Sequence, residues 1–343
     1  MLTESPEAPP QPPAPPSRRR TGRRMLLTGL AVVVAALFAV IAFVLWTNGQ
    51  IDRLPDGDLP SLTPVAASGT RTFLIVGTDD RSEIPDSFDD VFGAFEGSRT
   101  DTIMLVNFTP GQGAQLMSIP RDLRVDIPGF DKNGAPYGQN RINAAFVFGG
   151  PELLIATINQ NLGIDVNHYM EIDLAGFARL VDAVDGVRIL FEGAARDEKS
   201  GLNVEAGVQT LNGEEALAYV RSRKYQELRG GEWKTVGGND IGRTRRQQKL
   251  LLSLFDQVAS RKNLFNLPTF AQTFAQEVTV DAGLGLGVII DLGRAALDLS
   301  LEDIDAVTLP VVDERGTDGR AYVVPSPKAE RYLVAFRAGE PLE

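Results

Sequence analysis

The stretch Arg71-Thr-Phe-Leu-Ile-Val-Gly77 is a short apolar run that ends in glycine, which is typical of a buried β-strand. Two further strands are predicted just downstream, over residues 101–108 and 114–119. Charged side chains stand at the ends of these three strands: Asp79, Asp80 and Arg81, then Arg99 and Asp101, then Arg121 and Asp122. Binding sites in α/β folds tend to form where strand ends border one edge of the sheet.

Working outward from these strands, strand and helix patterns alternate without a detectable repeat, which favours one α/β domain over residues 71–343. A loop is expected over residues 192–210, and a glycine-rich gap precedes the helix that starts at Asp240. Helices are predicted over residues 141–148, 151–162, 173–184, 211–219, 240–259, 268–276, 286–298 and 326–337, with further strands over 186–191 and 306–312.

Positive charge is concentrated in Tyr219-Val-Arg-Ser-Arg-Lys224 and Asp240-Ile-Gly-Arg-Thr-Arg-Arg-Gln-Gln248, although the chain carries a net charge of −11. Few carboxylates are interleaved at helical spacing to neutralise it. The planar guanidinium group suits phosphate oxygens, so these segments predict a phosphate or pyrophosphate site.

Arg221 and Arg223 are two residues apart and share a face only on an extended segment. We therefore expect a helix to end near Tyr219 and both arginines to meet one ligand. The alternative is that each arginine pairs with a surface carboxylate such as Glu214.

The helix from Asp240 has an inward face that begins with polar residues. Arg243, Gln247, Leu250 and Leu254 fall within an arc of less than about 90°, whereas Arg245 points to solvent. An inward-facing arginine needs a partner or a ligand. Asp240 itself is either a helix cap or a catalytic group.

Composition excludes several chemistries. The chain has no cysteine, which excludes disulfides, thiolate zinc sites and cysteine nucleophiles. Its single histidine, His168, disfavours a Ser-His-Asp triad or a multi-histidine metal site. A hard cation on oxygen ligands, Mg²⁺ or Mn²⁺, remains, with Asp79 and Asp101 the best ligand candidates; ordinary capping roles are the alternative for both.

The N-terminal region predicts a membrane anchor. Residues 1–24 are proline-rich and then basic, which is typical of a disordered tail, and residues 25–46 contain no charge and suffice to span a bilayer. A cleaved signal peptide is the alternative. Residues 47–70 are expected to be a linker. The arginines before residue 25 place the N-terminus in the cytoplasm and the domain outside.

The remainder of the chain is strongly acidic. Residues 1–46 carry five arginines against two glutamates, which leaves −14 for residues 47–343. Such a balance argues against nucleic acid as a partner.

Several motifs together resemble the LytR–CpsA–Psr family of cell-wall glycopolymer ligases. The matching segments are Phe73–Arg81, Ser98–Met104, Ser118–Asp122, Arg141–Phe146, Leu211–Lys224 and Asp240–Gln248, in that family's order. The resemblance implies a single domain with a central mixed β-sheet flanked by helices, behind one transmembrane helix.

The resemblance also implies site residues and an activity. Magnesium would be held by Asp79 and Asp101, and the catalytic residues would be Asp79, Asp240 and Arg121. The diphosphate would be bound by Arg99, Arg121, Arg141, Arg221, Arg223, Arg243 and Gln247; Arg141 replaces the family's lysine. The implied reaction transfers a glycopolymer from undecaprenyl diphosphate to peptidoglycan at the cell membrane.

The implied lipid would lie in an apolar tunnel, for which the candidate lining residues are Phe146, Phe148, Leu153, Leu154, Phe177 and Leu180. Core packing explains each of them equally well. Two other functions stay open: a pyrophosphatase or hydrolase that uses water as acceptor, and a non-catalytic polyprenyl-phosphate-binding factor in wall assembly.

Overall fold

The computed structural model forms two compact units, residues 1–49 and 50–343. It describes residues 43–65, 69–78, 100–109, 113–131, 133–237, 240–259, 266–289, 291, 299–317 and 319–342. In the first unit only residues 43–49 are described, and they are helical. The expected tail and nearly all of the expected membrane helix over residues 25–46 lie outside the described residues.

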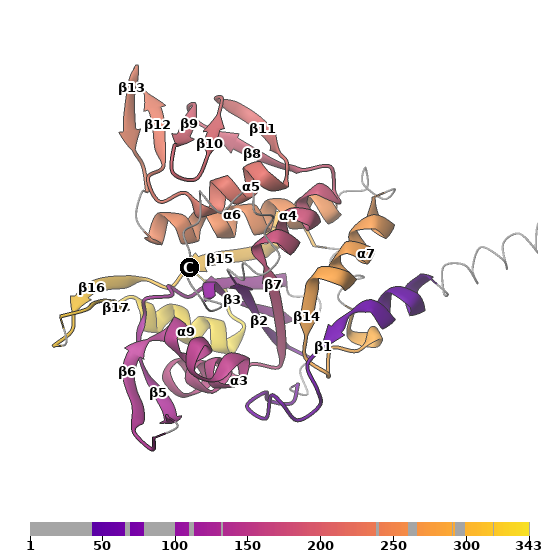
Figure 1. The fold of residues 1–343 in the computed structure, drawn as a ribbon, viewed down its shortest axis with the longest axis vertical. Helices are drawn as coiled ribbons and strands as arrows, with labels where there is room; N and C mark the ends of the chain where they lie inside the picture. The colour runs from indigo at the N-terminus through magenta and orange to yellow at the C-terminus, as the bar shows by residue number, and fades with distance from the viewer. Residues whose placement is uncertain are drawn as a thin grey trace, which may run out of the picture. The chain divides into compact units, whose positions relative to one another are not determined.

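The second unit is built on a seven-stranded sheet in the order β1-β14-β7-β2-β3-β4-β15 (Figure 1). Neighbours β1/β14, β2/β7 and β4/β15 are parallel and the other three pairs are antiparallel, so the expected mixed sheet is confirmed. The strands are β1 (Asp52–Arg53), β2 (Arg71–Thr78), β3 (Thr100–Thr109), β4 (Gly113–Ser118), β7 (His168–Asp173), β14 (Val278–Val280) and β15 (Ile304–Thr308).

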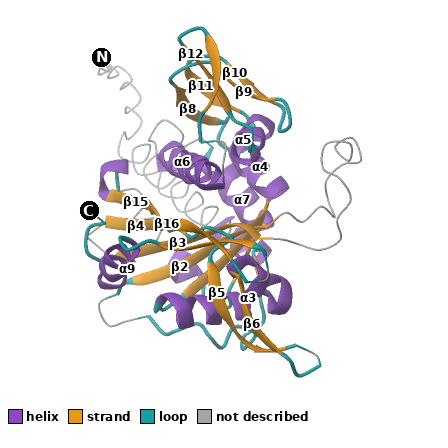
Figure 2. Ribbon diagram, turned by 90° about the vertical axis from the view of Figure 1, so that its left-hand side faces the viewer, coloured by secondary structure: helices purple, strands orange, loops and turns teal. Residues whose placement is uncertain are grey.

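Helices cover both faces of this sheet (Figure 2). Alternate residues of a strand point to opposite faces of the sheet. Because helices cover both faces, the side chains of β2 are buried on both sides. Leu74 and Val76 pack in one core cluster with α3 (Ile142–Leu162) and α9 (Ala329–Ala338). Ile75 and Gly77 line a cavity on the other face, with α4 (Leu174–Asp182), α5 (Gly213–Arg221) and α6 (Asp240–Ala259).

Helix α3 joins the two helices predicted at residues 141–148 and 151–162. Gly149 and Gly150 have non-helical backbone angles and Pro151 follows, so two helical segments meet at a kink there and the predicted interruption is confirmed. Among the described residues α3 is also the one helix long and apolar enough to span a membrane. Leu154, Ile155 and Ile158 are fully buried in the domain core, which identifies α3 as a core helix.

Small sheets lie beyond α5 and α6. The prediction of a loop over residues 192–210 is wrong, because this segment contains two strands and most of a third. These strands are only three to five residues long, too short for their periodicity to be recognised in the sequence. One small sheet pairs β8 (Val187–Phe191) with β11 (Gly207–Leu211). The other has four strands in the order β10 (Leu202–Val204), β9 (Ala195–Asp197), β12 (Gln226–Arg229) and β13 (Glu232–Thr235).

Two hairpins flank the sheet end near Arg121: β5 (Arg124–Phe130) with β6 (Pro136–Arg141), and β16 (Val311–Arg315) with β17 (Ala321–Pro325). The single strand predicted over residues 306–312 is wrong, because the chain leaves the sheet after β15 and starts β16 at Val311. The remaining elements are α7 (Leu267–Glu277) and a short 3-10 helix, η3 (Leu301–Asp303).

The segment expected to be a linker packs on the domain. β1 pairs with β14, Leu59 lies in the core cluster, and Ser61 Oγ donates a 2.5 Å hydrogen bond to Glu152 on α3. The folded unit therefore begins some twenty residues before the predicted start at residue 71.

Candidate active site

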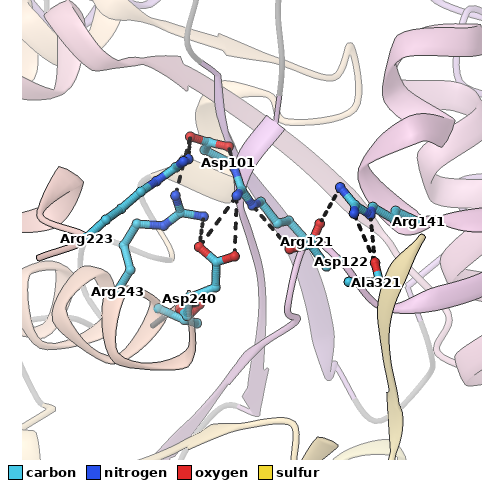
Figure 3. Close-up of polar contacts among 9 residues, drawn as sticks. Asp101, Arg121, Asp122, Arg141, Arg223, Asp240, Arg243 and Ala321 are labelled. Carbon is cyan, nitrogen blue, oxygen red and sulfur yellow. Dashed lines mark hydrogen bonds and ion pairs between the residues drawn. The ribbon is translucent and has the colours of Figure 1, made fainter. Parts of the chain in front are cut away.

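Arg121 lies at the centre of a cluster of charged side chains at one end of the sheet (Figure 3). It follows β4, and its Nη1 donates a 2.5 Å hydrogen bond to Asp101 Oδ1 on the neighbouring strand β3. Its Nη2 lies 3.4 Å from Asp240 Oδ2 at the start of α6. The antiparallel pairing of β3 with β4 thus brings together Asp101 and Arg121, two of the predicted strand-end residues. Helix α6 adds Asp240 to the cluster.

The first turn of α6 contributes Arg243, whose inward orientation is confirmed. Its side chain is 3% exposed, with Nη2 at 3.2 Å from Asp240 and Nη1 at 3.8 Å from Asp101. Burial is the largest influence and lowers the pKa of Arg243, and nearby Arg121 acts in the same direction. Its Nε has no hydrogen-bond partner among the described residues. A buried arginine with spare donors is suited to an anionic ligand.

Helix α5 and the turn that follows it supply Arg221 and Arg223. The helix begins with a capping box between Asn212 and Glu215 and runs through Arg221. The expected end near Tyr219 is therefore two residues early, and Arg221 is helical rather than extended. Ser222, with φ −58° and ψ 121°, turns the chain so that Arg223 Nη2 lies 3.9 Å from Asp101 Oδ2.

Arg141 lies on the opposite side of Arg121 (Figure 3). Its Nη1 is 3.2 Å from Asp122 Oδ1, and its Nη2 donates a 2.9 Å hydrogen bond to the backbone carbonyl of Ala321 on β17. Asp122 also lies 3.7 Å from Arg121. The hairpin β16–β17 therefore forms a wall of the site, a contribution that the sequence did not indicate.

Two of the three acidic residues next to Arg121, Asp240 and Asp122, have pKa values shifted in opposite directions. Burial alone would raise the pKa of Asp240, but Arg243 and Arg121 outweigh it and hold that pKa below the usual range. Burial raises the pKa of Asp122 despite Arg121 and Arg141 beside it. Asp240 is thus firmly anionic, which suits an anchor for two arginines better than a proton acceptor.

The cluster keeps a surplus of positive charge. Among the described residues, these ion pairs join four arginines and three aspartates, a net charge of +1: Arg121, Arg141, Arg223 and Arg243 with Asp101, Asp122 and Asp240. A surplus held in fixed positions favours a multiply charged anion such as a diphosphate.

A cavity of about 320 Å³, the apolar cavity, extends from this cluster between the sheet and helices α4, α5 and α6. Asp101, Arg221, Arg223, Arg243 and Gln247 line its charged end. Its remaining wall is largely hydrophobic and includes Ile75, Met104, Ile172, Phe177, Val220 and Leu251. The arrangement accommodates a ligand with an anionic head and an apolar tail.

Of the six hydrophobic residues considered for a lipid tunnel, only Phe177 lines this cavity. Leu154 and Leu180 are buried in separate core clusters, so the core-packing alternative holds for both. Phe148 lines a different cavity.

The structure describes only one of the two predicted metal ligands, Asp101. Asp79 and Arg99 lie outside the described residues, and the described part of the chain contains no group of three or more acidic, histidine or cysteine side chains that could hold an ion. Asp101 is a hard oxygen donor of the kind that Mg²⁺ binds, and it faces the apolar cavity at its charged end. The donor type fits the predicted ion.

A buried network that the sequence did not reveal supports the turn after α5. Asp197, 2% exposed, accepts hydrogen bonds from Ser222 Oγ at 2.6 Å and from the backbone N–H of Lys224 at 2.7 Å. Buried Arg246 donates to the Ser222 carbonyl and stacks over the Tyr225 ring at 4.7 Å. The only signal was the density of arginines in residues 243–246.

Fold and site together define an α/β domain with an arginine-lined anion site at the mouth of an apolar cavity. The family model of the LytR_cpsA_psr family matches residues 51–335. The chain therefore belongs to the LytR_cpsA_psr family.

Curated relatives agree with this assignment. The probable cell wall biosynthesis protein LcpB of Corynebacterium glutamicum is 31% identical over 333 residues, 91% of this chain and 75% of that protein. The regulatory protein MsrR of Staphylococcus aureus is 32% identical over 237 residues, 65% of this chain. The chain covers less than two thirds of MsrR, namely 64% of its length.

Solved structures share the fold. A LytR-Csp2A-Psr enzyme from Actinomyces oris aligns with a TM-score of 0.64 at 28% identity, over 83% of this chain and 95% of that one. TagT bound to LIIa-WTA aligns with a TM-score of 0.60 at 22% identity, over 84% of this chain and 98% of that one, which is a likeness of fold alone.

Proposed function

We propose that this protein is a membrane-anchored phosphotransferase that moves a glycopolymer from an undecaprenyl diphosphate carrier to peptidoglycan. The observation that carries the proposal is the convergence of Arg121, Arg223 and Arg243 at the mouth of the apolar cavity. A lipid diphosphate has the same two parts, an anionic head and a long apolar tail. Relatives named for cell wall biosynthesis, and a structural neighbour described as bound to LIIa-WTA, support the same substrate class.

The reaction breaks a phosphoanhydride bond of the donor and forms a phosphate ester bond to the acceptor. An acceptor hydroxyl attacks the phosphorus that carries the glycan, a new P–O bond forms, and the bond to the lipid phosphate breaks. Polyprenyl phosphate leaves with the electron pair, and the hydroxyl proton passes to a carboxylate. Phosphoryl transfer of this kind depends mainly on positioning and charge stabilisation, which fixed arginines supply.

The residues of the site have distinct roles in the proposed reaction. Arg221, Arg223 and Arg243 hold the diphosphate with Gln247 beside them, and Arg121 holds Asp101 and Asp240 in place. Asp101, together with Asp79, would hold a Mg²⁺ or Mn²⁺ ion, which neutralises charge on phosphate oxygens when bound. The lowered pKa of Asp240 makes it a weaker base than an ordinary carboxylate, and Asp79 and Asp240 are both candidates for the proton acceptor.

The location belongs to the same proposal: residues 25–46 anchor the chain, with the N-terminus in the cytoplasm and the domain outside. Protease added to intact protoplasts should digest the domain and spare an epitope fused to the N-terminus. Protection of the domain would contradict this orientation.

The deciding experiment incubates the full-length protein with a short-chain lipid-linked saccharide, labelled in the glycan, and with peptidoglycan. Label bound covalently to peptidoglycan supports transfer, whereas free glycan phosphate alone identifies a hydrolase. Replacing both Arg221 and Arg223 with Ala should abolish transfer, and Arg245→Ala, an exposed arginine of α6, is the matched control. A non-catalytic binder would give no product, and the double variant would retain its cellular function.

A further inference from the structure

A second cavity, of about 510 Å³, lies beside the same arginine cluster. Its walls contain four arginines and one carboxylate: Arg121, Arg141, Arg223 and Arg320 with Asp122. Arg121 and Arg223 also pair with Asp101 or Asp240, and with these two aspartates counted the net charge is +1. A wall rich in guanidinium groups favours an anionic ligand over a neutral one.

The second cavity also has an aromatic wall. Phe148 on α3 is 40% exposed and stacks on Tyr137 of β6, with ring centroids 5.0 Å apart and planes inclined by 12°. The amide side chains of Asn140 and Asn143 line the cavity near this wall. A flat aromatic surface with amide and guanidinium donors next to it matches a saccharide, which offers an apolar ring face and a hydroxyl rim.

Apart from Arg223, the two cavities are lined by residues from different sides of the sheet. Ile75 and Met104 face the apolar cavity, whereas Leu74 of the same strand β2 packs in the core cluster that contains α3. The second cavity is lined by the first turns of α3 and therefore lies towards that opposite face. Arg223 lines both cavities, so the diphosphate-binding group is where they meet.

This separation has a stereochemical meaning. In phosphoryl transfer the attacking and the leaving oxygen lie roughly in line on opposite sides of phosphorus. If the lipid phosphate leaves towards the apolar cavity, the attacking hydroxyl must approach from the other side. The second cavity meets the apolar cavity at Arg223 and extends towards α3, so it is placed to receive an acceptor from that side, and its guanidinium groups suit an acidic one.

We infer that the second cavity is the acceptor subsite and that it binds an acidic saccharide, with Arg320 and Phe148 as binding residues. This rests on the proposed function. The acceptor's hydroxyl oxygen forms the new bond to phosphorus, the lipid phosphate leaves into the apolar cavity with the electron pair, and the proton passes to a carboxylate of the site. Arg320 comes from the turn before β17, which gives the C-terminal hairpin a role in acceptor choice.

The test measures transfer by the full-length protein while donor and acceptor concentrations are varied separately. The acceptors are a soluble peptidoglycan glycan fragment and an uncharged chitin oligosaccharide of equal length. Arg320→Ala and Phe148→Ala should each raise the KM for the peptidoglycan fragment about tenfold, with the KM for the donor unchanged. Arg320→Ala should also reduce the preference for the acidic fragment over chitin. The matched controls are Arg315→Ala on the same hairpin and Phe130→Ala, an exposed aromatic on β5.

The possible outcomes are distinct. If the wild-type protein transfers glycan and both variants keep the wild-type KM for the acceptor, the inference is wrong and the proposed function stands. If the variants raise the KM for the donor instead, the cavity holds the donor's glycan, which also overturns the inference. A wild-type protein that forms no adduct overturns the proposed function and the inference together. Thermal unfolding of each variant checks that it is folded.

Discussion

Arg243 shows most directly what the site is built to bind. Its guanidinium is almost fully buried, both carboxylates that it meets are at 3.2 Å or more, and its Nε has no hydrogen-bond partner among the described residues. A buried charge that is only loosely paired is costly to the fold. Under the proposed function, the diphosphate of the donor accepts the remaining N–H groups and offsets this cost.

Replacing Arg243 with Lys tests whether shape or only charge matters. Lysine keeps the charge but lacks the planar fork, so the initial rate of transfer should fall about a hundredfold. Arg245→Lys on the same helix should have no effect, because Arg245 is exposed. A rate for Arg243→Lys within about twofold of wild type would refute a bidentate role.

At the scale of elements, the end of α5 is fixed by residues that the sequence did not single out. Asp197 on β9 holds Ser222 and the N–H of Lys224, and Arg246 on α6 holds the Ser222 carbonyl. The turn that carries Arg223 is therefore held by hydrogen bonds from two elements, β9 and α6. Positioning by hydrogen-bonded neighbours of this kind keeps a binding group in its productive geometry.

Asp197→Asn should weaken this turn in a pH-dependent manner. Burial alone would raise the pKa of Asp197, but hydrogen bonds from Ser222 and from the backbone of Lys224 and Lys199 hold it below the usual range. A lowered folded-state pKa contributes stability above the unfolded-state pKa, near 4, and that stability is lost as pH falls below it. The variant should be less stable than wild type by about 1–3 kcal/mol at pH 7.

The measurement is thermal unfolding followed by tryptophan fluorescence at several pH values. The difference between Asp197→Asn and wild type should narrow as pH falls below about 4. Glu198→Gln, an exposed neighbour, is the control. A difference that stays constant from pH 7 to pH 3 would exclude the ionised carboxylate as its source.

These elements also show how far sequence reasoning reaches. The long strands of the central sheet and helix α6 were predicted, because their apolar periodicity is sustained over many residues. The three-residue strands β9 and β10 were not, because they are stabilised by pairing rather than by pattern. The contact of Arg141 with Ala321 joins residues 180 positions apart, which no local pattern can show.

At the scale of the whole domain, the sheet divides the site into an apolar side and a polar side. If the apolar cavity holds the lipid chain, filling it should affect long chains more than short ones. Leu251→Trp, which narrows the cavity from α6, should raise the KM for a long-chain donor about tenfold and leave that for a short-chain donor unchanged. Lys249→Ala, on the exposed side of α6, is the control. If the Leu251→Trp variant had equal KM values for the two donors, the assignment of the lipid chain to this cavity would be wrong.

The wall that β17 provides has a consequence for biogenesis. Asp101 and Arg121 come from the first half of the chain, whereas Ala321, which holds Arg141, comes from its last tenth. A nascent polypeptide lacking β16 and β17 can form the central strands and still leave one flank of the arginine cluster open to water. Completion of the site is thereby tied to completion of synthesis, because a chain that lacks its last tenth has Asp101 and Arg121 without the surface that holds Arg141.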